Sequence, residues 1–389
     1  MIRQPVYYGG NIPSMSVEVL LIRSRPVADQ GRYLNTLRMF REHGFTARTL
    51  CWDRQRQRPK TETIEGFFVR NARVPGAFSN RSLLLWVPLW WVYEFFYLIF
   101  HPAHCYYAAD LDTAVPVLIW VKFLRLFGLK PSFIFDIADF YTAKAMALPK
   151  PLYRPLNAVE RLLAVQADAT VIPDEARIYL LEGAQPKRLF FVPNTSYDKV
   201  KPEWEKKDNH ELVLFCAGSL TPDRGVTKLI EATKGLDRVR VVFAGRAISQ
   251  EQVEEFQQSP HVEYLGLIPQ EEVLHRTVEA DVVYSYYDPS LEINKTANST
   301  KIFEAMMCGT AILCNSEPPS TRIVQETGCG VCLPYSDDDG LRQTIIQWRD
   351  LREITREMGR RGRKAFEEQY SWPVTAAPLA AFLHELLGH

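Results

Sequence analysis

The chain has 389 residues, of which 47% are hydrophobic and 24% are charged, and its 46 basic residues balance its 46 acidic ones. This length is typical of two domains rather than one, and the composition excludes a disordered, collagen-like or disulfide-rich protein. The seven cysteines are scattered and odd in number, and the first apolar run, at residues 17–22, is too short for a signal peptide. We therefore expect a reduced, cytoplasmic setting.

The zero net charge conceals a difference between the two halves. Residues 1–200 hold 25 Lys and Arg against 17 Asp and Glu, whereas residues 201–389 hold 21 against 29. A basic first half favours an anionic partner, with the inner face of a membrane as the leading candidate. Chance scatter of charges accounts for the same counts, so both interpretations stay open.

Short apolar runs alternate with longer helical patterns along the chain, which predicts an α/β protein with parallel sheets. In the first half we expect helices at 30–43, 112–127, 152–167 and 174–182, and strands at 17–22, 45–51, 66–70, 104–108, 132–136, 168–172 and 188–192. In the second half we expect strands at 212–217, 239–244, 261–265, 281–285, 311–314 and 330–333, and helices that begin near Gly225, Gln250, Pro269, Ser299, Ser320 and Asp337.

The stretch 193–208 has two prolines, four lysines and no apolar periodicity, and we interpret it as a hinge. It separates a first domain, residues 1–200, from a second domain, residues 201–371. Open parallel sheets bind ligands at the carboxyl ends of their strands. Two such sheets facing each other therefore predict a ligand site in the cleft between them.

Residues 82–101 form an apolar segment that is long enough to cross a membrane. Pro88, Glu94 and the position of the segment between two sheet strands argue against a span. One alternative is an interfacial helix, whose rings at Trp86, Trp90, Trp91, Tyr93 and Tyr97 would lie among lipid headgroups. This peripheral membrane contact would suit a lipid-linked substrate. The other alternative is a helix buried under the sheet.

Residues 298–309 follow the expected strand at 281–285 and predict a helix that opens at Ser299 or Thr300. Hydroxyl side chains and free backbone N–H groups at a helix start form an anion site, to which Lys301 adds a positive charge. Glu304, one turn further, suits a ribose diol. The alternative is an ordinary capped helix with a surface glutamate.

A second polar cluster, residues 218–226, follows the expected strand at 212–217. Gly218 at the strand exit lets the backbone approach a ligand closely. Arg224 lies in a turn just before a helix, where its fork of donors suits a diphosphate. The alternative is a plain strand-to-helix turn with a surface arginine.

Together these segments resemble the retaining GT-B glycosyltransferases usually called family 4, or glycosyl transferases group 1. The similar segments are 218–232, 242–245, 262–269, 279–283, 301–309 and 370–372, so the resemblance covers residues 212–389. It implies two Rossmann-like domains facing a cleft, with a last helix in residues 372–389 that crosses back onto the first domain. It also implies sugar transfer from a nucleotide-diphosphate sugar without a metal or cofactor.

The resemblance assigns roles to particular positions. The implied donor-binding residues are Gly218, Ser219, Arg224, Leu267, Ile268, Asn298, Ser299, Thr300, Lys301 and Glu304. Arg224 and Lys301 would act in catalysis by stabilising the leaving phosphate. The family pattern has an arginine in place of Ser219 and a glutamate in place of Thr296, for which Glu292 could substitute. These departures leave an inactive partner subunit as an alternative, beside a nucleotide-sugar epimerase or hydrolase.

In the first half, residues 106–113 and 135–139 resemble a branch of the same family with aspartates at two strand ends. Asp110, Asp112, Asp139 and Arg32 are therefore candidates for binding a glycan or lipid-linked acceptor, with Asp139 also a catalytic candidate. The alternative is that the aspartates cap the helices that follow them. This branch often has a histidine at the position of Ala138.

Two other patterns predict no site. Cys329 and Cys332 have the spacing of a redox or zinc motif, but no second Cys or His pair follows them, and the histidines show no metal-ligand spacing. The sequence has no stretch in which basic and aromatic residues alternate, so we expect no nucleic-acid partner. A cell-envelope polysaccharide or glycolipid product is the expectation that remains.

Overall fold

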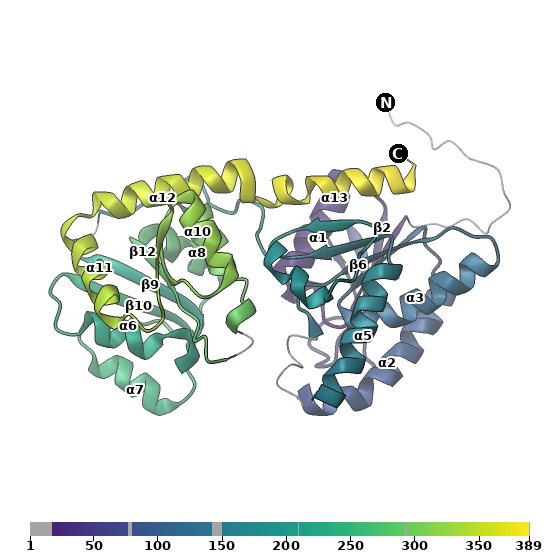
Figure 1. Cartoon of the computed structure of the whole chain (residues 1–389), viewed down its shortest axis with the longest axis horizontal. Coiled ribbons are helices and arrows are strands. Elements are labelled where there is room, and N and C mark those ends of the chain that lie inside the picture. The colour runs from purple at the N-terminus through teal and green to yellow at the C-terminus, as the bar shows by residue number, and fades with distance from the viewer. Residues whose placement is uncertain (1–17, 77–79, 142–149, 209, 292–293, 389) are drawn as a thin grey trace.

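The computed structural model describes residues 18–76, 80–141, 150–208, 210–291 and 294–388, and it contains two α/β domains side by side (Figure 1). The predicted fold class, two Rossmann-like domains of the GT-B type, is confirmed. Every strand expected from the sequence is present, as are the expected helices, except that the stretch near 174–182 is a 3₁₀ helix, Glu175–Leu181.

The first domain is built on an eight-stranded sheet with the order β3-β4-β2-β1-β5-β6-β7-β8. Only β3 is antiparallel, to β4, and the other pairs are parallel. The strands are β1 (Val19–Arg23), β2 (Ala47–Trp52), β3 (Thr61–Ile64), β4 (Phe67–Ala72), β5 (Cys105–Ala109), β6 (Ser132–Asp136), β7 (Ala169–Ile172) and β8 (Leu189–Phe191). The helices are α1 (Gly31–Glu42), α2 (Asn80–Phe100), α3 (Leu111–Leu126) and α5 (Lys150–Gln166).

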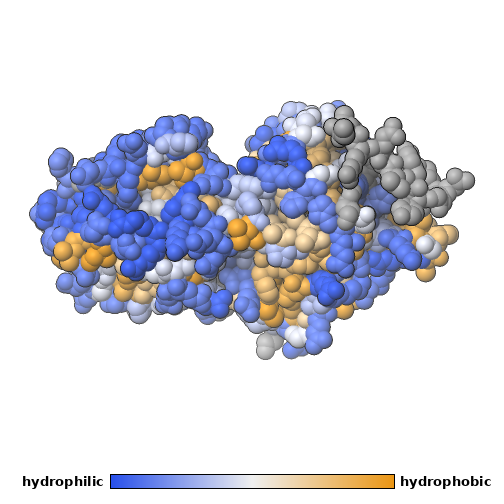
Figure 2. All heavy atoms as spheres, turned by 90° about the horizontal axis from the view of Figure 1, so that it is seen from above, coloured by the Kyte–Doolittle hydropathy of each residue, from blue (hydrophilic) through white to orange (hydrophobic). Residues whose placement is uncertain are grey.

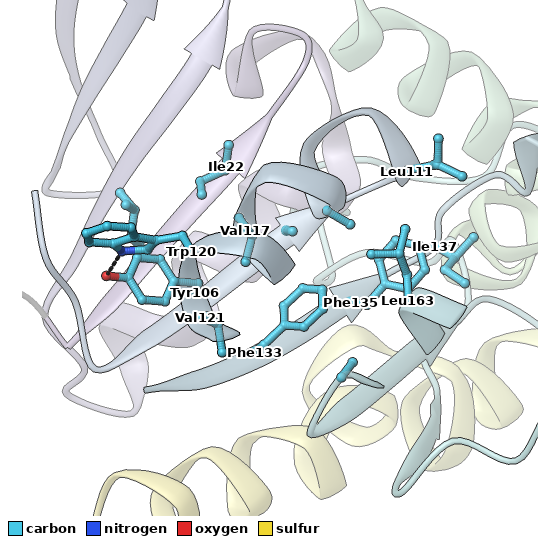
Figure 3. Close-up of a cluster of buried hydrophobic side chains, with 14 of the residues drawn as sticks. Ile22, Tyr106, Leu111, Val117, Trp120, Val121, Phe133, Phe135, Ile137 and Leu163 are labelled. Atoms are coloured by element: carbon cyan, nitrogen blue, oxygen red, sulfur yellow. Dashed lines mark hydrogen bonds between the residues drawn. The ribbon is translucent and has the colours of Figure 1, made fainter. Parts of the chain in front are cut away.

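Helices cover both faces of this sheet, so its central strands β1, β5 and β6 are buried along their whole length. Helices α2, α3 and α5 pack on one face, where Val117 and Trp120 of α3 belong to the same hydrophobic cluster as Phe133 and Phe135 of β6 (Figure 3). The indole N–H of Trp120 donates a hydrogen bond of 2.9 Å to the Tyr106 hydroxyl.

Helix α1 and the C-terminal helix α13 (Trp372–Leu387) cover the other face. Trp372, Leu379 and Leu383 of α13 are buried in the same cluster as Leu37 and Phe40 of α1. The backbone N–H of Trp372 also donates to the Ser196 carbonyl at 2.9 Å. The last helix therefore belongs to the core of the first domain, as predicted, and is reached by a crossing from the second domain (Figure 1).

The second domain is a six-stranded parallel sheet with the order β11-β10-β9-β12-β13-β14. The order reverses between β9 and β12, which makes a crevice at their carboxyl ends. The strands are β9 (Leu212–Ser219), β10 (Val239–Arg246), β11 (Val262–Tyr264), β12 (Val282–Ser285), β13 (Ala311–Asn315) and β14 (Gly330–Leu333). The helices are α6 (Val226–Thr233), α7 (Gln250–Gln258), α8 (Gln270–Glu279), α9 (Thr300–Cys308), α10 (Arg322–Thr327), α11 (Asp338–Asp350) and α12 (Glu353–Ala365).

Residues 82–100 of the apolar segment lie within α2, which packs on the sheet along one side. Trp90 is fully buried and stacks on Trp52 with ring centroids 5.3 Å apart, and Tyr97 is also buried. The prediction that these two rings lie among lipid headgroups is therefore wrong, because they fill the interior. Within the part of the chain that the structure describes, no helix has both the length and the hydrophobicity of a membrane span.

Candidate functional site

A cavity of about 600 Å³ lies between the two domains, at the carboxyl ends of both sheets. The first domain contributes the start of α1, the loop after β6 and the hinge, and the second contributes α8 and α9. Four of the predicted site residues line it: Arg32, Asp139, Thr300 and Glu304. The sequence thus predicted residues from both domains that the fold brings to one cavity.

The ends of β9 and β10 in the second domain approach each other closely. Gly218 lies near the end of β9 with a φ of +113° and Gly245 lies near the end of β10 with a φ of +149°. A Cβ on Gly245 would lie 1.7 Å from the carbonyl oxygen of Gly218, and a Cβ on Gly218 would meet the Lys301 ammonium at 3.4 Å. Glycine is required here because any side chain would push these strand ends apart. The Lys301 ammonium therefore lies over bare backbone.

Two cations meet on the ring of Tyr287, which follows β12. The Arg224 guanidinium carbon lies 4.2 Å from the ring centroid, and the Lys301 ammonium lies 5.9 Å from it. Burial favours the neutral phenol, but the charges of Lys301 and Arg224 and a hydrogen bond with Ser299 outweigh it and lower the pKa of Tyr287. The predicted residues Arg224, Lys301 and Gly218 thus form one positive site. Sequence reasoning missed Tyr287, although it lies just beyond the predicted strand.

The start of α9 faces this positive site. Ser299 is its N-cap residue, but the hydroxyl caps no backbone N–H and instead bonds to the hydroxyls of Ser285 at 3.0 Å and Tyr287 at 3.1 Å. In the first turn of α9 the N–H of Ile302 donates to the Ser299 carbonyl at 3.3 Å, and the Ser299 side chain leaves the N–H groups of Thr300 and Lys301 for another acceptor. Asn298 lies just before and donates to Asp174 of the first domain at 3.2 Å, so it links the two domains.

Glu304 lies one turn into α9, on the wall of the cavity. Its carboxylate accepts a hydrogen bond of 2.8 Å from the side-chain amide of Gln270 on α8. Burial raises the pKa of Glu304 above its ordinary value, although Lys301, Gln270 and the hinge residue Lys199 oppose the rise. A half-buried carboxylate that keeps one oxygen for a ligand suits a diol.

The remaining donor-side residues are more exposed or face inward. Ser219 is exposed at the end of β9. The Leu267 side chain is 72% exposed in the loop after β11, whereas Ile268 packs on the hydrophobic cluster around Phe215. Glu292 and the Thr296 side chain, the two candidates for a sugar contact at this loop, lie outside the described residues.

On the first-domain side, Asp139 is the most accessible predicted residue. Its side chain is 56% exposed and lies 3.7 Å from the buried Arg177 guanidinium. Arg177 also donates to the Ala138 carbonyl at 3.0 Å, which fixes the loop after β6. Asp139 therefore lines the cavity from a loop that Arg177 anchors.

Asp110 and Asp112 do not line this cavity. Asp110 has a φ of +67°, and its carboxylate pairs with Arg23 at 3.2 Å and accepts from the backbone N–H groups of Ala138 and Asp139. Asp110 therefore links the carboxyl ends of β1, β5 and β6. Asp112 is buried beside Glu94 of α2, and burial together with Asp112 raises the pKa of Glu94.

Arg32 lines the cavity, but its guanidinium is held by groups of the first-domain sheet. It donates to the Asp136 carboxylate at 2.8 Å and to the Val192 carbonyl at 2.6 Å, and the Tyr107 hydroxyl donates to the same carboxylate at 2.7 Å. The side chains of Arg32 and Asp136 are 5% and 1% exposed. The arrangement is that of a structural ion pair that holds α1 to β6 and β8.

Two of the free cysteines lie side by side on neighbouring strands. Cys332 lies against Cys314 of the neighbouring strand, with the sulfurs 3.3 Å apart, rather than against Cys329. Among the described residues, no group of three or more His, Cys, Asp or Glu is arranged to hold a metal ion.

Comparisons with known proteins agree with this geometry. Residues 198–365, most of the second domain, match the model of the family Glycosyl transferases group 1. No curated protein sequence gives a significant match.

Solved structures resemble the chain over both domains. Sucrose-phosphate synthase from Thermosynechococcus elongatus has a TM-score of 0.76 at 14% identity, covering 95% of this chain and 99% of that one. WaaG, a glycosyltransferase involved in lipopolysaccharide biosynthesis, has a TM-score of 0.64 at 14% identity, with coverages of 94% and 99%. Anabaena HepE in complex with UDP has a TM-score of 0.68 at 13% identity, with coverages of 95% and 100%. At these identities the likeness shows the GT-B fold alone.

Proposed function

We propose that this protein is a retaining glycosyltransferase of the family 4 type, which moves a sugar from a nucleoside-diphosphate sugar to a hydroxyl group of a glycan or lipid-linked acceptor. The observation that carries the proposal is the convergence of Arg224 and Lys301 on Tyr287, beside the exposed backbone of Gly218 and the start of α9. This site lies within the residues that match the glycosyl transferase family.

The site suits a diphosphate that gains charge as it leaves. The bond between the anomeric carbon and the phosphate oxygen breaks while the acceptor oxygen bonds to the same face of that carbon. The acceptor proton passes to the departing phosphate oxygen, so no protein nucleophile takes part. Arg224, Lys301 and the N–H groups of α9 stabilise the charge of the leaving group. Because these cations supply the positive charge, we propose that the reaction needs no metal ion or cofactor.

Other predicted residues fit the remaining parts of the two substrates. Glu304 would accept hydrogen bonds from the ribose of the donor, and the backbone at Leu267 and Ile268 would meet the base. Asp139 lies on the opposite wall and would orient the acceptor hydroxyl. Acceptors of this kind fit a role in cell-envelope polysaccharide or glycolipid synthesis, at the inner face of a membrane.

Thermal unfolding with UDP-, GDP-, ADP- and CDP-sugars tests the donor site. A ligand at 100 times its Kd stabilises the folded state by about 2.7 kcal/mol, which is a clear shift of the melting temperature. One nucleotide should shift the wild type and not Arg224→Ala. The control is Arg238→Ala, which removes an exposed arginine at the amino end of the same sheet and should respond like the wild type.

Three results would count against the proposal. If no nucleotide shifts the melting temperature, the assignment of the donor site is wrong. A normal shift without transfer to any acceptor would favour an inactive partner subunit. Product formation from the donor in the absence of an acceptor would favour an epimerase or a hydrolase.

A further inference from the structure

Helices α2, α3 and α5 lie side by side over one face of the first domain (Figure 1), and their outer surface is strongly apolar. We call this surface the three-helix face. Its most exposed members are Phe96 and Phe100 of α2, Phe123 and Leu126 of α3, the following residue Phe127, and Leu162 of α5. Leu126 is 83% exposed and Phe100 is 74% exposed. Seen from above, on the side of α12 and α13, hydrophobic residues are also more prominent on the first domain than on the second, but this view does not look onto the three-helix face (Figure 2).

In the same three helices the acidic residues are buried, whereas basic residues are exposed. The helices contain three acidic residues, Glu94, Asp112 and Glu160, and all three are buried. By contrast, Lys122 of α3 and Arg154 of α5 are exposed. Over their described residues, the outer surfaces of α2, α3 and α5 therefore present apolar groups and cations but no carboxylate. Such a surface complements an anionic one.

The aromatic rings of α2 show why its outer side is so apolar. Trp90 stacks on Trp52 inside the domain, and Tyr97 stacks on His101 with ring centroids 3.8 Å apart. Two of the amphipathic rings are thus inside and those of Trp86, Trp91 and Tyr93 are half-buried, so the most exposed side chains of α2 are phenylalanine and aliphatic ones. These side chains suit the acyl boundary of a bilayer better than its headgroup layer.

A second copy of the chain fits this face less well. A symmetric dimer brings the same surface of two copies together, so it would bury the cations of both copies in one interface to which this face contributes no carboxylate. Like charges in contact oppose association, whereas lipid phosphates neutralise them.

We propose that the three-helix face docks on an anionic lipid bilayer, with its apolar side chains in the acyl boundary and Lys122 and Arg154 at the phosphates. This inference goes beyond the proposed transfer reaction and does not depend on the donor site. It brings the first domain, which supplies Asp139, to the lipid surface.

Co-sedimentation of the full chain with vesicles tests the proposal. Vesicles of phosphatidylcholine mixed with phosphatidylglycerol should bind the protein, and vesicles of phosphatidylcholine alone should bind it much more weakly. The variant Phe96→Ser/Phe100→Ser/Phe127→Ser should lower the partition about ten-fold or more. The variant Lys122→Gln/Arg154→Gln should lose the preference for phosphatidylglycerol.

A matched control uses exposed apolar residues of the second domain. Ile248 and Leu351 are 55% and 56% exposed, close to the 57% of Phe96. Ile248→Ser/Leu351→Ser should bind vesicles like the wild type. Equal partition of this control and the triple variant, or no binding by the wild type, would overturn the proposal.

Two further measurements distinguish membrane docking from dimer formation and from a folding defect. Sedimentation equilibrium without lipid would reveal a dimer, and a dimer that the triple serine variant abolishes would assign the face to a second copy instead. Nucleotide-induced thermal shifts report on folding and on the donor site. A triple variant that is folded and binds nucleotide but does not bind vesicles supports the docking face. If the wild type binds vesicles but no nucleotide shifts its melting temperature, only the proposed transfer reaction is refuted.

Discussion

Replacing Asp136 with asparagine removes the charge that holds Arg32 in the interior of the first domain. Burial lowers the pKa of the Arg32 guanidinium, but the charge and hydrogen bonds of Asp136 outweigh it and raise that pKa. The intrinsic pKa of a guanidinium is so high that arginine keeps its charge in proteins, so Arg32 stays charged in Asp136→Asn and loses its counterion. Removing one partner of a buried ion pair costs about 3–5 kcal/mol. At roughly 2–4 °C per kcal/mol for a domain of this size, the first domain should melt roughly 6–20 °C earlier.

The assay is urea unfolding followed by tryptophan fluorescence, with two comparisons. Glu182→Gln removes an exposed partner of Arg161, 2.8 Å away, and should cost less than about 1 kcal/mol. Arg32→Met/Asp136→Leu removes both charges and should recover much of the lost stability. A loss below about 1 kcal/mol in Asp136→Asn, together with a raised KM for the acceptor, would refute the structural assignment and restore Arg32 as an acceptor-binding residue.

Three further predictions concern the donor site. Because two cations lower the pKa of Tyr287, its ionisation should weaken nucleotide binding as pH rises toward the ordinary tyrosine value of about 10, and Tyr287→Phe should abolish this dependence in titrations by calorimetry. Burial raises the pKa of Glu304, so the fall of donor affinity on acidification should occur at a pH above the ordinary glutamate pKa of about 4.3. Glu304→Gln should raise the donor Kd and remove this pH dependence. Gly245→Ala should abolish the nucleotide-induced thermal shift, because its Cβ would clash with Gly218. The control is Gly235→Ala: Gly235 has a φ of +72° and open space around it, so this variant should cost only about 1–2 kcal/mol of backbone strain in thermal unfolding. Equal behaviour of the two variants would contradict the inference that the two strand ends require glycine.

The fold was predictable because its strands are short apolar runs and most of its helices have apolar stripes. Helix α12 was missed for the opposite reason. Its buried side consists of small residues, including Gly359 and Gly362, because a broad apolar stripe is not needed where two backbones touch. A Cβ on Gly359 would lie 2.1 Å from the Gly309 carbonyl oxygen. The edge strand β3 was missed because its residues, Thr61–Ile64, are mostly polar and partly exposed.

The candidate site shows a similar division. Gly218, Arg224 and Lys301 were predictable because each lies at the end or the beginning of an element, and strand ends of one parallel sheet meet at one edge. The role of Arg32 was not, because its partner Asp136 lies 104 positions away and only the fold reveals that the pair is buried. The same holds for Asp110, whose carboxylate accepts from backbone N–H groups of another loop.

Helix α13 gives the chain a particular order of maturation during synthesis on the ribosome. Trp372, Leu379 and Leu383 complete the hydrophobic cluster under α1, so the first domain lacks part of its interior until residues 372–387 have emerged. Domains usually fold in the order in which they are made. Here the second domain has all of its strands and helices first, and the nascent first domain must wait with apolar surface uncovered while about 170 more residues are translated. At rates of roughly 5–20 residues per second, that interval lasts on the order of ten seconds or more, during which chaperones have access to the unfinished face.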